Sequence, residues 1–247
     1  MSGHSKWANI QHRKGRQDAK KAKFFTKAAK DIILAAKAGG GNPDDNAGLR
    51  LAIQKAKAVN LPKDKIDNAI KKGTGELAGG DILEVYYEGY GPNGVAIMVD
   101  VATDNKNRVV AEIRHAFTKH GGNLGENGSV AYLFNKKGVI VFDKEKYTED
   151  QLMEIGLEAG AEDIVDDGDT FTVQTEPGDF MAVQQAFTDA GMEFESAEVS
   201  QVPETLVAVD VATGRKVMNL VDTLEDNEDV QKVFLNADFP DEVFEDE

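Results

Sequence analysis

Apolar residues over the first eighty positions recur at helical spacing and predict three helices. The first is expected over residues 17–38, and its apolar positions share an arc of about half the helix circumference. The second is expected to begin at Asn42-Pro43, because Asn is a good N-cap and Pro suits the first turn. The third is expected to start near Pro62 and to stop at Gly73. These apolar positions of the first helix are Phe24, Phe25, Ala28, Ala29, Ile32, Ala35 and Ala36.

After residue 81 the pattern changes, and short apolar runs alternate with helical stretches. Residues 138–199 show the order β-α-β-β-α-β, which is the ferredoxin-like pattern. The segments on either side of this block contain too few strands to cover a sheet alone, so we expect them to combine. The flanking elements expected are strands 83–88, 94–102 and 129–134 with helix 105–120, and then strands 205–211 and 229–235 with helix 213–224.

The pattern therefore predicts an α+β multidomain protein. Residues 1–80 are expected to form a basic helical domain, a helical bundle at the N-terminus. Residues 81–134 plus 205–247 are expected to form a discontinuous α/β middle domain. Residues 135–204 are expected to be an inserted βαββαβ domain. In this fold class, two ferredoxin-like α/β domains follow the bundle, and the middle one is interrupted by the other.

Charge is distributed very unevenly over these segments. The 247 residues carry a formal net charge of −16. Residues 1–80 contain 17 Lys and Arg against 7 acids, a net of +10, whereas the rest of the chain carries −26. A local positive excess on an acidic protein indicates a polyanionic partner held by one end of the molecule.

The basic residues of the N-terminal segment form a stripe and an arm. Lys20, Lys23, Lys27, Lys30 and Lys37 fall within about a third of the helix circumference, away from the apolar face. Such a face is often merely solvated. Here it continues into basic residues of the arm, interleaved with two rings that are suited to stacking on exposed bases. The predicted nucleic-acid-binding residues are Lys6, Trp7, His12, Arg13, Lys14, Arg16, Lys20, Lys23, Lys27, Lys30 and Lys37.

Motifs for other chemistry are weak or absent. Residues 89–94 match G-x-G-x-x-G, but an apolar strand follows them where a dinucleotide fold needs a helix. Asn93-Gly94 instead indicates a hairpin turn. Glu112 and His115 lie three residues apart without a second such pair, which favours a surface role. We therefore expect no enzyme activity, no catalytic residue, no cofactor, no bound metal and no small-molecule substrate.

Composition also bears on the compartment. The chain has no cysteine, which excludes disulfides and Cys-ligated zinc and is typical of a reducing compartment. The N-terminal residues contain no apolar segment of signal-peptide length. No apolar run approaches the roughly 18 residues that a membrane helix needs. We expect a cytoplasmic protein without a membrane partner.

Several sequence segments together resemble the YebC/PmpR family, whose eukaryotic relatives are mitochondrial translational activators. The resemblance extends from residue 3 to the C-terminus. The matching segments are Gly3-His4-Ser5-Lys6-Trp7-Ala8-Asn9-Ile10, His12-Arg13-Lys14, Asn46-Ala47-Gly48-Leu49-Arg50-Leu51-Ala52-Ile53, Asn60-Leu61-Pro62-Lys63, Ala69-Ile70-Lys71-Lys72-Gly73-Thr74-Gly75, Tyr87-Glu88-Gly89-Tyr90-Gly91-Pro92, Arg114-His115-Ala116-Phe117 and Lys119-His120-Gly121-Gly122-Asn123-Leu124-Gly125.

The resemblance implies a three-domain fold with a discontinuous middle domain, and no cofactor or catalytic residue. It also implies a DNA-binding transcriptional regulator, or alternatively a ribosome-associated translation factor that relieves stalls at proline-rich stretches. The expected partner is accordingly DNA, or ribosomal or messenger RNA, or the ribosome itself. A protein-interaction module remains a third alternative. The basic helix has no Asn, Gln or Arg triplet placed for base edges, which weakens sequence-specific readout.

Overall fold

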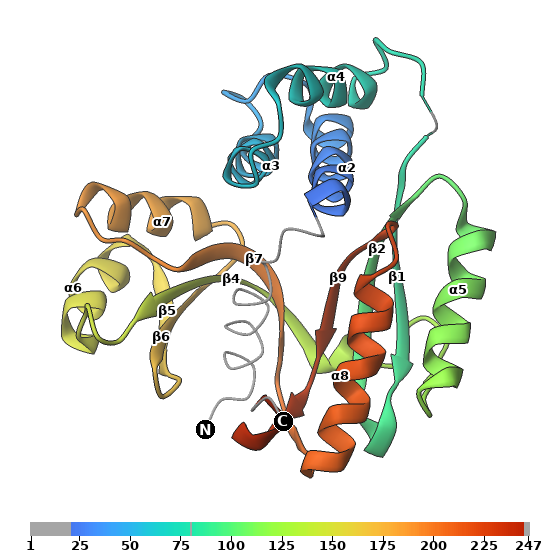
Figure 1. Cartoon of the computed structure of the whole chain (residues 1–247). Helices are drawn as coiled ribbons and strands as arrows, with labels where there is room; N and C mark the ends of the chain where they lie inside the picture. Colours follow the sequence, from blue (N-terminus) through green and yellow to red (C-terminus); the bar gives the residue numbers. More distant parts are fainter. Residues whose placement is uncertain (1–20, 80, 245–247) are drawn as a thin grey trace.

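The computed structural model describes residues 21–79 and 81–244. It shows an α+β fold, as the sequence predicts: a bundle of N-terminal helices lies beside two units that each contain a four-stranded antiparallel sheet (Figure 1). The helices lie over the place where the two sheets approach each other. All three parts therefore meet at one junction.

The N-terminal unit consists of α2 (Lys21–Gly39), α3 (Ala47–Ala58) and α4 (Lys63–Gly73). Its core is small and aliphatic, and Ile32 and Leu49 are fully buried at its centre. The apolar arc predicted for the first helix provides the α2 side of this core. The third helix ends at Gly73, as predicted. A Cβ at this position would approach the Ile33 carbonyl oxygen of α2 to 2.5 Å, so the close packing of the two helices requires glycine here.

The second helix begins later than predicted, and the residue that caps it is Asn46. The Asn46 side chain accepts a hydrogen bond from the Leu49 N–H at 3.0 Å. Its amide also donates to the carbonyl oxygens of Ala35 and Gly40, both at 2.8 Å. Asn42 instead caps an exposed turn through the Asp44 N–H. Asn46 is selected because it joins two helices, which is a tertiary effect that a capping rule cannot include.

The middle sheet has the strand order β3-β1-β2-β9. Its strands are β1 (Leu83–Tyr90), β2 (Ala96–Thr103), the short β3 (Asn123–Leu124) and β9 (Val230–Leu235). The helices α5 (Lys106–Lys119) and α8 (Val211–Glu225) cover one face, and the largest core cluster lies between them and the sheet (Figure 1). The β1–β2 hairpin turns at Asn93 and Gly94, both with positive φ, as predicted.

One predicted strand of this unit is wrong, and another is much shorter than predicted. Residues 129–134 contain a 3-10 turn, Ala131–Leu133, because the buried carboxylate of Glu88 accepts the N–H groups of Gly128, Val130 and Ala131 at 2.7–2.8 Å. A loop whose N–H groups are captured in this way cannot join a ladder. Residues 205–211 contain only β8 (Val207–Ala208), which pairs in parallel with β10 (Ala237–Asp238).

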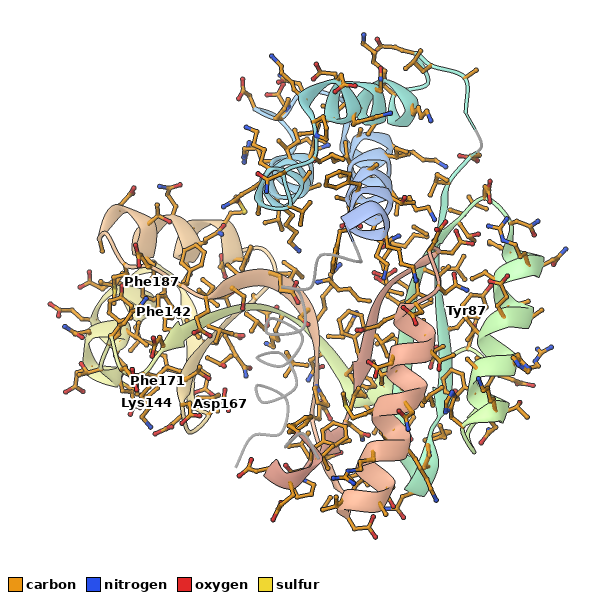
Figure 2. The ribbon with its side chains drawn as sticks, in the orientation of Figure 1. Tyr87, Phe142, Lys144, Asp167, Phe171 and Phe187 are labelled. Carbon is orange, nitrogen blue, oxygen red and sulfur yellow. The ribbon has the colours of Figure 1, made fainter. Side chains whose placement is uncertain are left out.

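The third unit has the strand order β5-β6-β4-β7, which is the ferredoxin-like order. Its strands are β4 (Phe134–Asp143), β5 (Ala161–Asp166), β6 (Thr170–Thr175) and β7 (Ser196–Pro203), and its helices are α6 (Glu149–Ala159) and α7 (Phe180–Asp189). Phe142 and Phe187 fill the core with ring centroids 4.7 Å apart, and Lys144 lies over the Phe171 ring at the edge (Figure 2).

Two long strands connect the sheets. β4 and β7 pair along eight residues and run from one unit into the other (Figure 1). Phe134 at the start of β4 packs in a cluster with Met98 and Phe234 of the middle sheet, whereas Ile140 belongs to the core of the third unit. The pairing of β9 with β2 supports a discontinuous middle domain, which remains our proposal for the domain boundaries.

We expect Asn46→Ala to destabilise the N-terminal unit by about 1–3 kcal/mol, because it removes a cap and leaves buried carbonyl oxygens without donors. The measurement is the free energy of unfolding from urea titration. Asn42→Ala is the matched control, since the Asn42 side chain is exposed. This control should lower the free energy of unfolding by only a small fraction of the loss expected for Asn46→Ala. Equal effects of the two substitutions would contradict the assignment of Asn46 as the cap.

Candidate nucleic-acid interface

The predicted nucleic-acid-binding set divides into two parts. Lys6, Trp7, His12, Arg13, Lys14, Arg16 and Lys20 lie outside the described residues. The remaining members, Lys23, Lys27, Lys30 and Lys37, lie on α2. The structure therefore bears directly only on the α2 stripe.

Three lysines of the stripe face the end of α8 and the loop after it. The Lys23 ammonium donates to the Asp226 carbonyl oxygen at 2.9 Å. Lys27 donates to the carbonyl oxygen of Glu225 at 3.0 Å. Lys30 lies one further turn along the helix and donates to the Glu228 carbonyl oxygen, also at 3.0 Å. The stripe in this structure thus meets protein acceptors.

This contact has a clear electrostatic cause. The last carbonyl oxygens of a helix have no intrahelical partner, and the helix dipole makes that end negative. Side-chain carboxylates add to it: Lys23 lies 3.2 Å from Asp226, and Lys30 lies 2.6 Å from Asp229. Lys37, at the other end of α2, pairs with Asp81 in the connection to the middle unit. The stripe caps α8 much as bound cations would.

The Lys30–Asp229 pair is the most enclosed of these contacts. The two side chains are 13% and 9% exposed. Asp229 also accepts hydrogen bonds from Arg108 at 2.6 Å and Thr103 at 3.0 Å. Although burial opposes ionisation, Arg108 and Lys30 hold the pKa of Asp229 below its usual value. Asp229 is therefore ionised at neutral pH and links α2 to α5 and β2.

A second group of charges lies where all three units meet. Glu198 of β7 pairs with Lys232 of β9, and it lies 3.5 Å from the ammonium group of Lys55 on α3. Burial raises the pKa of Glu198, but Lys232 and Lys55 outweigh it and hold that pKa at about 2. Asp31 of α2 adds a further carboxyl, whose pKa burial raises. Residues from all three units thus contribute to a single ionic cluster.

Asp100 of β2 completes the junction. Burial raises its pKa to about 7, and the carboxylates of Glu84 and Asp31 act in the same direction, against Lys232. Its Oδ1 atom is buried and has no hydrogen-bond partner among the described residues. A neutral carboxyl group suits such a position better than an ion does. Asp100 therefore titrates close to neutral pH.

The N-terminal unit has a second basic surface that the sequence reasoning did not single out. Lys65, Lys71 and Lys72 of α4 are exposed, and none of them forms an ion pair with another residue that the structure describes. The sequence does contain one indication of this surface, because the net charge of residues 1–80 is larger than the α2 stripe alone contributes.

The described residues also bear on metal binding, on the role of Glu112 and on membrane-spanning helices. Residues 21–79 and 81–244 contain no cluster of three or more His, Asp and Glu residues that could hold a metal. Glu112 accepts a hydrogen bond from Asn227 at 2.6 Å, which accounts for its place on α5. Within the same ranges, no helix is long and apolar enough to cross a membrane.

Two family models match the chain. One, described as the TACO1/YebC protein N-terminal domain, matches residues 5–76. The other, described as the TACO1/YebC second and third domain, matches residues 82–237. The boundary between the two matches lies in the connection from α4 to β1 of the middle sheet.

Similar proteins come from several bacteria. Proteins named "Probable transcriptional regulatory protein" are 68% identical in Maridesulfovibrio salexigens, over 98% of both chains, and 60% identical in Solidesulfovibrio magneticus, over 99% of this chain and 100% of the other. One from Treponema pallidum is 54% identical over 98% and 99%. The crystal structure of a conserved hypothetical protein from Aquifex aeolicus is 43% identical with a TM-score of 0.83, covering 93% of this chain and 95% of that one.

The raised pKa of Asp100 predicts a pH-dependent stability. A carboxyl whose pKa is about 3.8 unfolded and about 7 folded stabilises the fold at low pH, and this contribution is lost as the pH rises through that window. Asp31 acts in the same direction. Relative to Asp100→Asn, the native protein should lose up to about 1.4 kcal/mol of unfolding free energy per pH unit between about pH 5 and 7.

The measurement is a set of urea titrations across that pH range. Asp169→Asn, which changes an exposed carboxyl in the third unit, serves as the control and should run parallel to the native protein. Parallel curves for the native protein and Asp100→Asn would show that Asp100 is ionised throughout.

Proposed function

Because this chain belongs to the TACO1/YebC family of regulatory proteins, we propose that it is a nucleic-acid-binding regulator of gene expression whose basic N-terminal unit makes the contact. The observation that carries the proposal is the exposed lysine surface of α4, which forms no ion pair with a described residue, on a molecule whose remainder is strongly acidic. Phosphate neutralisation by Lys and Arg provides most of non-specific nucleic-acid affinity.

The two lysine surfaces have different roles in this proposal. Lys65, Lys71 and Lys72 can meet phosphates without any change in the protein. Lys23, Lys27 and Lys30 are bonded to the end of α8, so a polyanion reaches them only by replacing those acceptors. We therefore assign first contact to α4 and the basic arm. The α2 stripe joins the interface when the N-terminal unit leaves the junction.

The nature of the target follows from the charge of the rest of the molecule. The names of the relatives favour promoter DNA, and a DNA-binding transcriptional regulator remains one candidate. A bare duplex, however, offers only phosphates to two acidic units, which it repels. RNA beside basic proteins, as on a ribosome, offers partners to both ends of this charge distribution. We therefore favour a ribosome-associated role in translation.

The available helices also argue against base-specific readout of DNA. α2 packs its basic face against α8. On α3, the Arg50 guanidinium is bonded to the carbonyl oxygens of Pro43 and Asp44 at 2.7 and 2.9 Å. Among the described residues, this leaves no helix that presents free Arg, Asn and Gln side chains together to a major groove. Contact with the backbone of a shaped RNA requires no such helix.

Charge reversal tests the assigned surface. We expect the triple variant Lys65→Glu/Lys71→Glu/Lys72→Glu to bind structured RNA more weakly and to flatten the dependence of log K on log salt by about 0.7–0.9 for each lost phosphate contact. The measurement is fluorescence anisotropy over a salt series.

Lys106→Glu/Lys119→Glu/Lys216→Glu is the matched control, because it makes the same change in net charge at exposed lysines of the middle unit. Its binding should fall only slightly, and its salt slope should stay unchanged. Equal losses in the two triple variants would mean that net charge, and not the α4 surface, governs binding.

The choice between the two targets needs a paired titration at one physiological salt concentration. We expect binding to a promoter fragment near the non-specific range of roughly 10⁻⁴–10⁻⁶ M, with little preference over scrambled DNA. Binding to ribosomes should be tighter and should be lost in the α4 variant. A promoter site bound about a thousandfold more tightly than scrambled DNA would restore the transcriptional candidate.

A further inference from the structure

A groove with a cavity volume of about 850 Å³ separates the N-terminal unit from α7 of the third unit. Its floor is aliphatic and includes Ile53, Ile66 and Met181. Its rim on the N-terminal side carries Arg50, Lys57 and Lys63, and Asp67 is the only acid that lines it. Neither Lys57 nor Lys63 forms an ion pair with another described residue. The groove is thus apolar inside and positive at its edge.

The opposite wall of the groove contains a polar group without a partner. Gln184 of α7 is only 6% exposed and lines the groove. Among the described residues, its side-chain amide forms no hydrogen bond. Because this amide lines the groove, an occupant of the groove can form hydrogen bonds with it.

The helix α6 presents the complementary surface. Met153 and Leu157 lie one turn apart and are 39% and 52% exposed, which makes them two of the few large apolar side chains on the described surface. Carboxylates flank this pair on both sides. The flanking acids are Glu149, Asp150, Glu154 and Glu158, and none of them is in an ion pair with a described residue.

Between these two surfaces lies α7, and its outer side is nearly uncharged. Its ten residues include a single charged side chain, Asp189. Ala182 and Gln185 are exposed along it. α7 packs against α6 on one side and borders the groove on the other (Figure 1). One continuous face therefore runs from positive and apolar, through neutral, to negative and apolar.

We propose that this face is a dimer interface between two copies of the chain, in which α6 of each copy lies over the groove of the other. A two-fold axis through the outer side of α7 exchanges the two ends of the face, so both contacts form at once and the assembly closes as a pair. Leu157 and Met153 then cover the aliphatic floor. The acids of α6 meet Lys57 and Lys63 of the second copy.

The chemistry of the groove favours a second copy over other occupants. The described residues that line the groove include no aromatic side chain to stack a base, and this distinguishes it from a site for single-stranded nucleic acid. The α6 surface supplies both the charge and the apolar side chains that the groove lacks. The groove lining does not include Lys65, Lys71 or Lys72, the α4 lysines assigned to nucleic acid, so this test is independent of the proposed function.

The first test is sedimentation equilibrium of the full chain over a concentration series at low salt. We expect a reversible equilibrium between one and two copies that added salt weakens, because the contacts are between charges at an open rim. A mass of one chain at every concentration overturns the proposal. Assemblies that keep growing beyond two copies overturn the two-fold arrangement.

The second test exchanges the charges on the two surfaces. Lys57→Glu/Lys63→Glu reverses the groove, and Glu154→Lys/Glu158→Lys reverses α6. Each variant alone places like charges opposite each other, so its self-association should weaken by more than about tenfold. Mixed in equal amounts, the two variants place opposite charges at both contacts. We therefore expect the mixture to form pairs that contain one copy of each.

The control Lys106→Glu/Lys216→Glu makes, on the middle unit, the same change in net charge as Lys57→Glu/Lys63→Glu, and it should associate as the native protein does. Thermal melting of every variant checks that each is folded. If the two charge-reversed variants dimerise alone as well as the native protein, or if their mixture stays monomeric, the assigned surfaces are wrong.

Discussion

The arrangement of the three units depends on one ionic cluster, in which opposite charges from all of them meet in a poorly solvated place. Lys232 and Lys55 neutralise the charge of Glu198. Asp31 and Asp100 add two more carboxyl groups, and two ammonium groups cannot neutralise all three carboxylates. Ionised carboxylates in excess are costly in such surroundings, and protonation relieves that cost. The cluster thus couples the fit between units to proton concentration. A continuous apolar interface would hold the units more simply, but it would not respond to pH or salt.

The same electrostatics explains the acidic character of the body. The end of α8 and the loop that follows present main-chain carbonyl oxygens and carboxylates to the α2 lysines, and these are the same kinds of acceptor that a phosphate backbone offers. The protein therefore contains an internal substitute for its proposed ligand. Discrimination against weak or poorly shaped polyanions follows, because a competitor must replace contacts that are already made. The same competition lowers the affinity of the protein for its proposed nucleic-acid ligand.

Much of the architecture could be predicted from the sequence, because β6, α4 and the β1–β2 hairpin are specified by local patterns. The failures share a physical cause. Asn46 replaces Asn42 as a cap because its amide reaches a neighbouring helix, and residues 129–134 are held by Glu88 from forty positions away. Likewise, helical spacing identified which lysines share a face of α2 but contained no information on what that face meets. Local rules fail where a distant side chain decides.

The paired strands β4 and β7 have a mechanical consequence. The two strands form an antiparallel ribbon, and each end of it is anchored in a different core. Sliding of one strand along the other is resisted, because all the hydrogen bonds between the strands would have to break together. Twisting of the ribbon about its own axis is easier. The N-terminal unit is joined to the rest by a single stretch of backbone after α4. The ribbon therefore permits the third unit to twist, whereas the N-terminal unit is held beyond that stretch by side-chain contacts such as Lys30–Asp229 and Lys55–Glu198, so the two units differ in the kind of movement that is open to them.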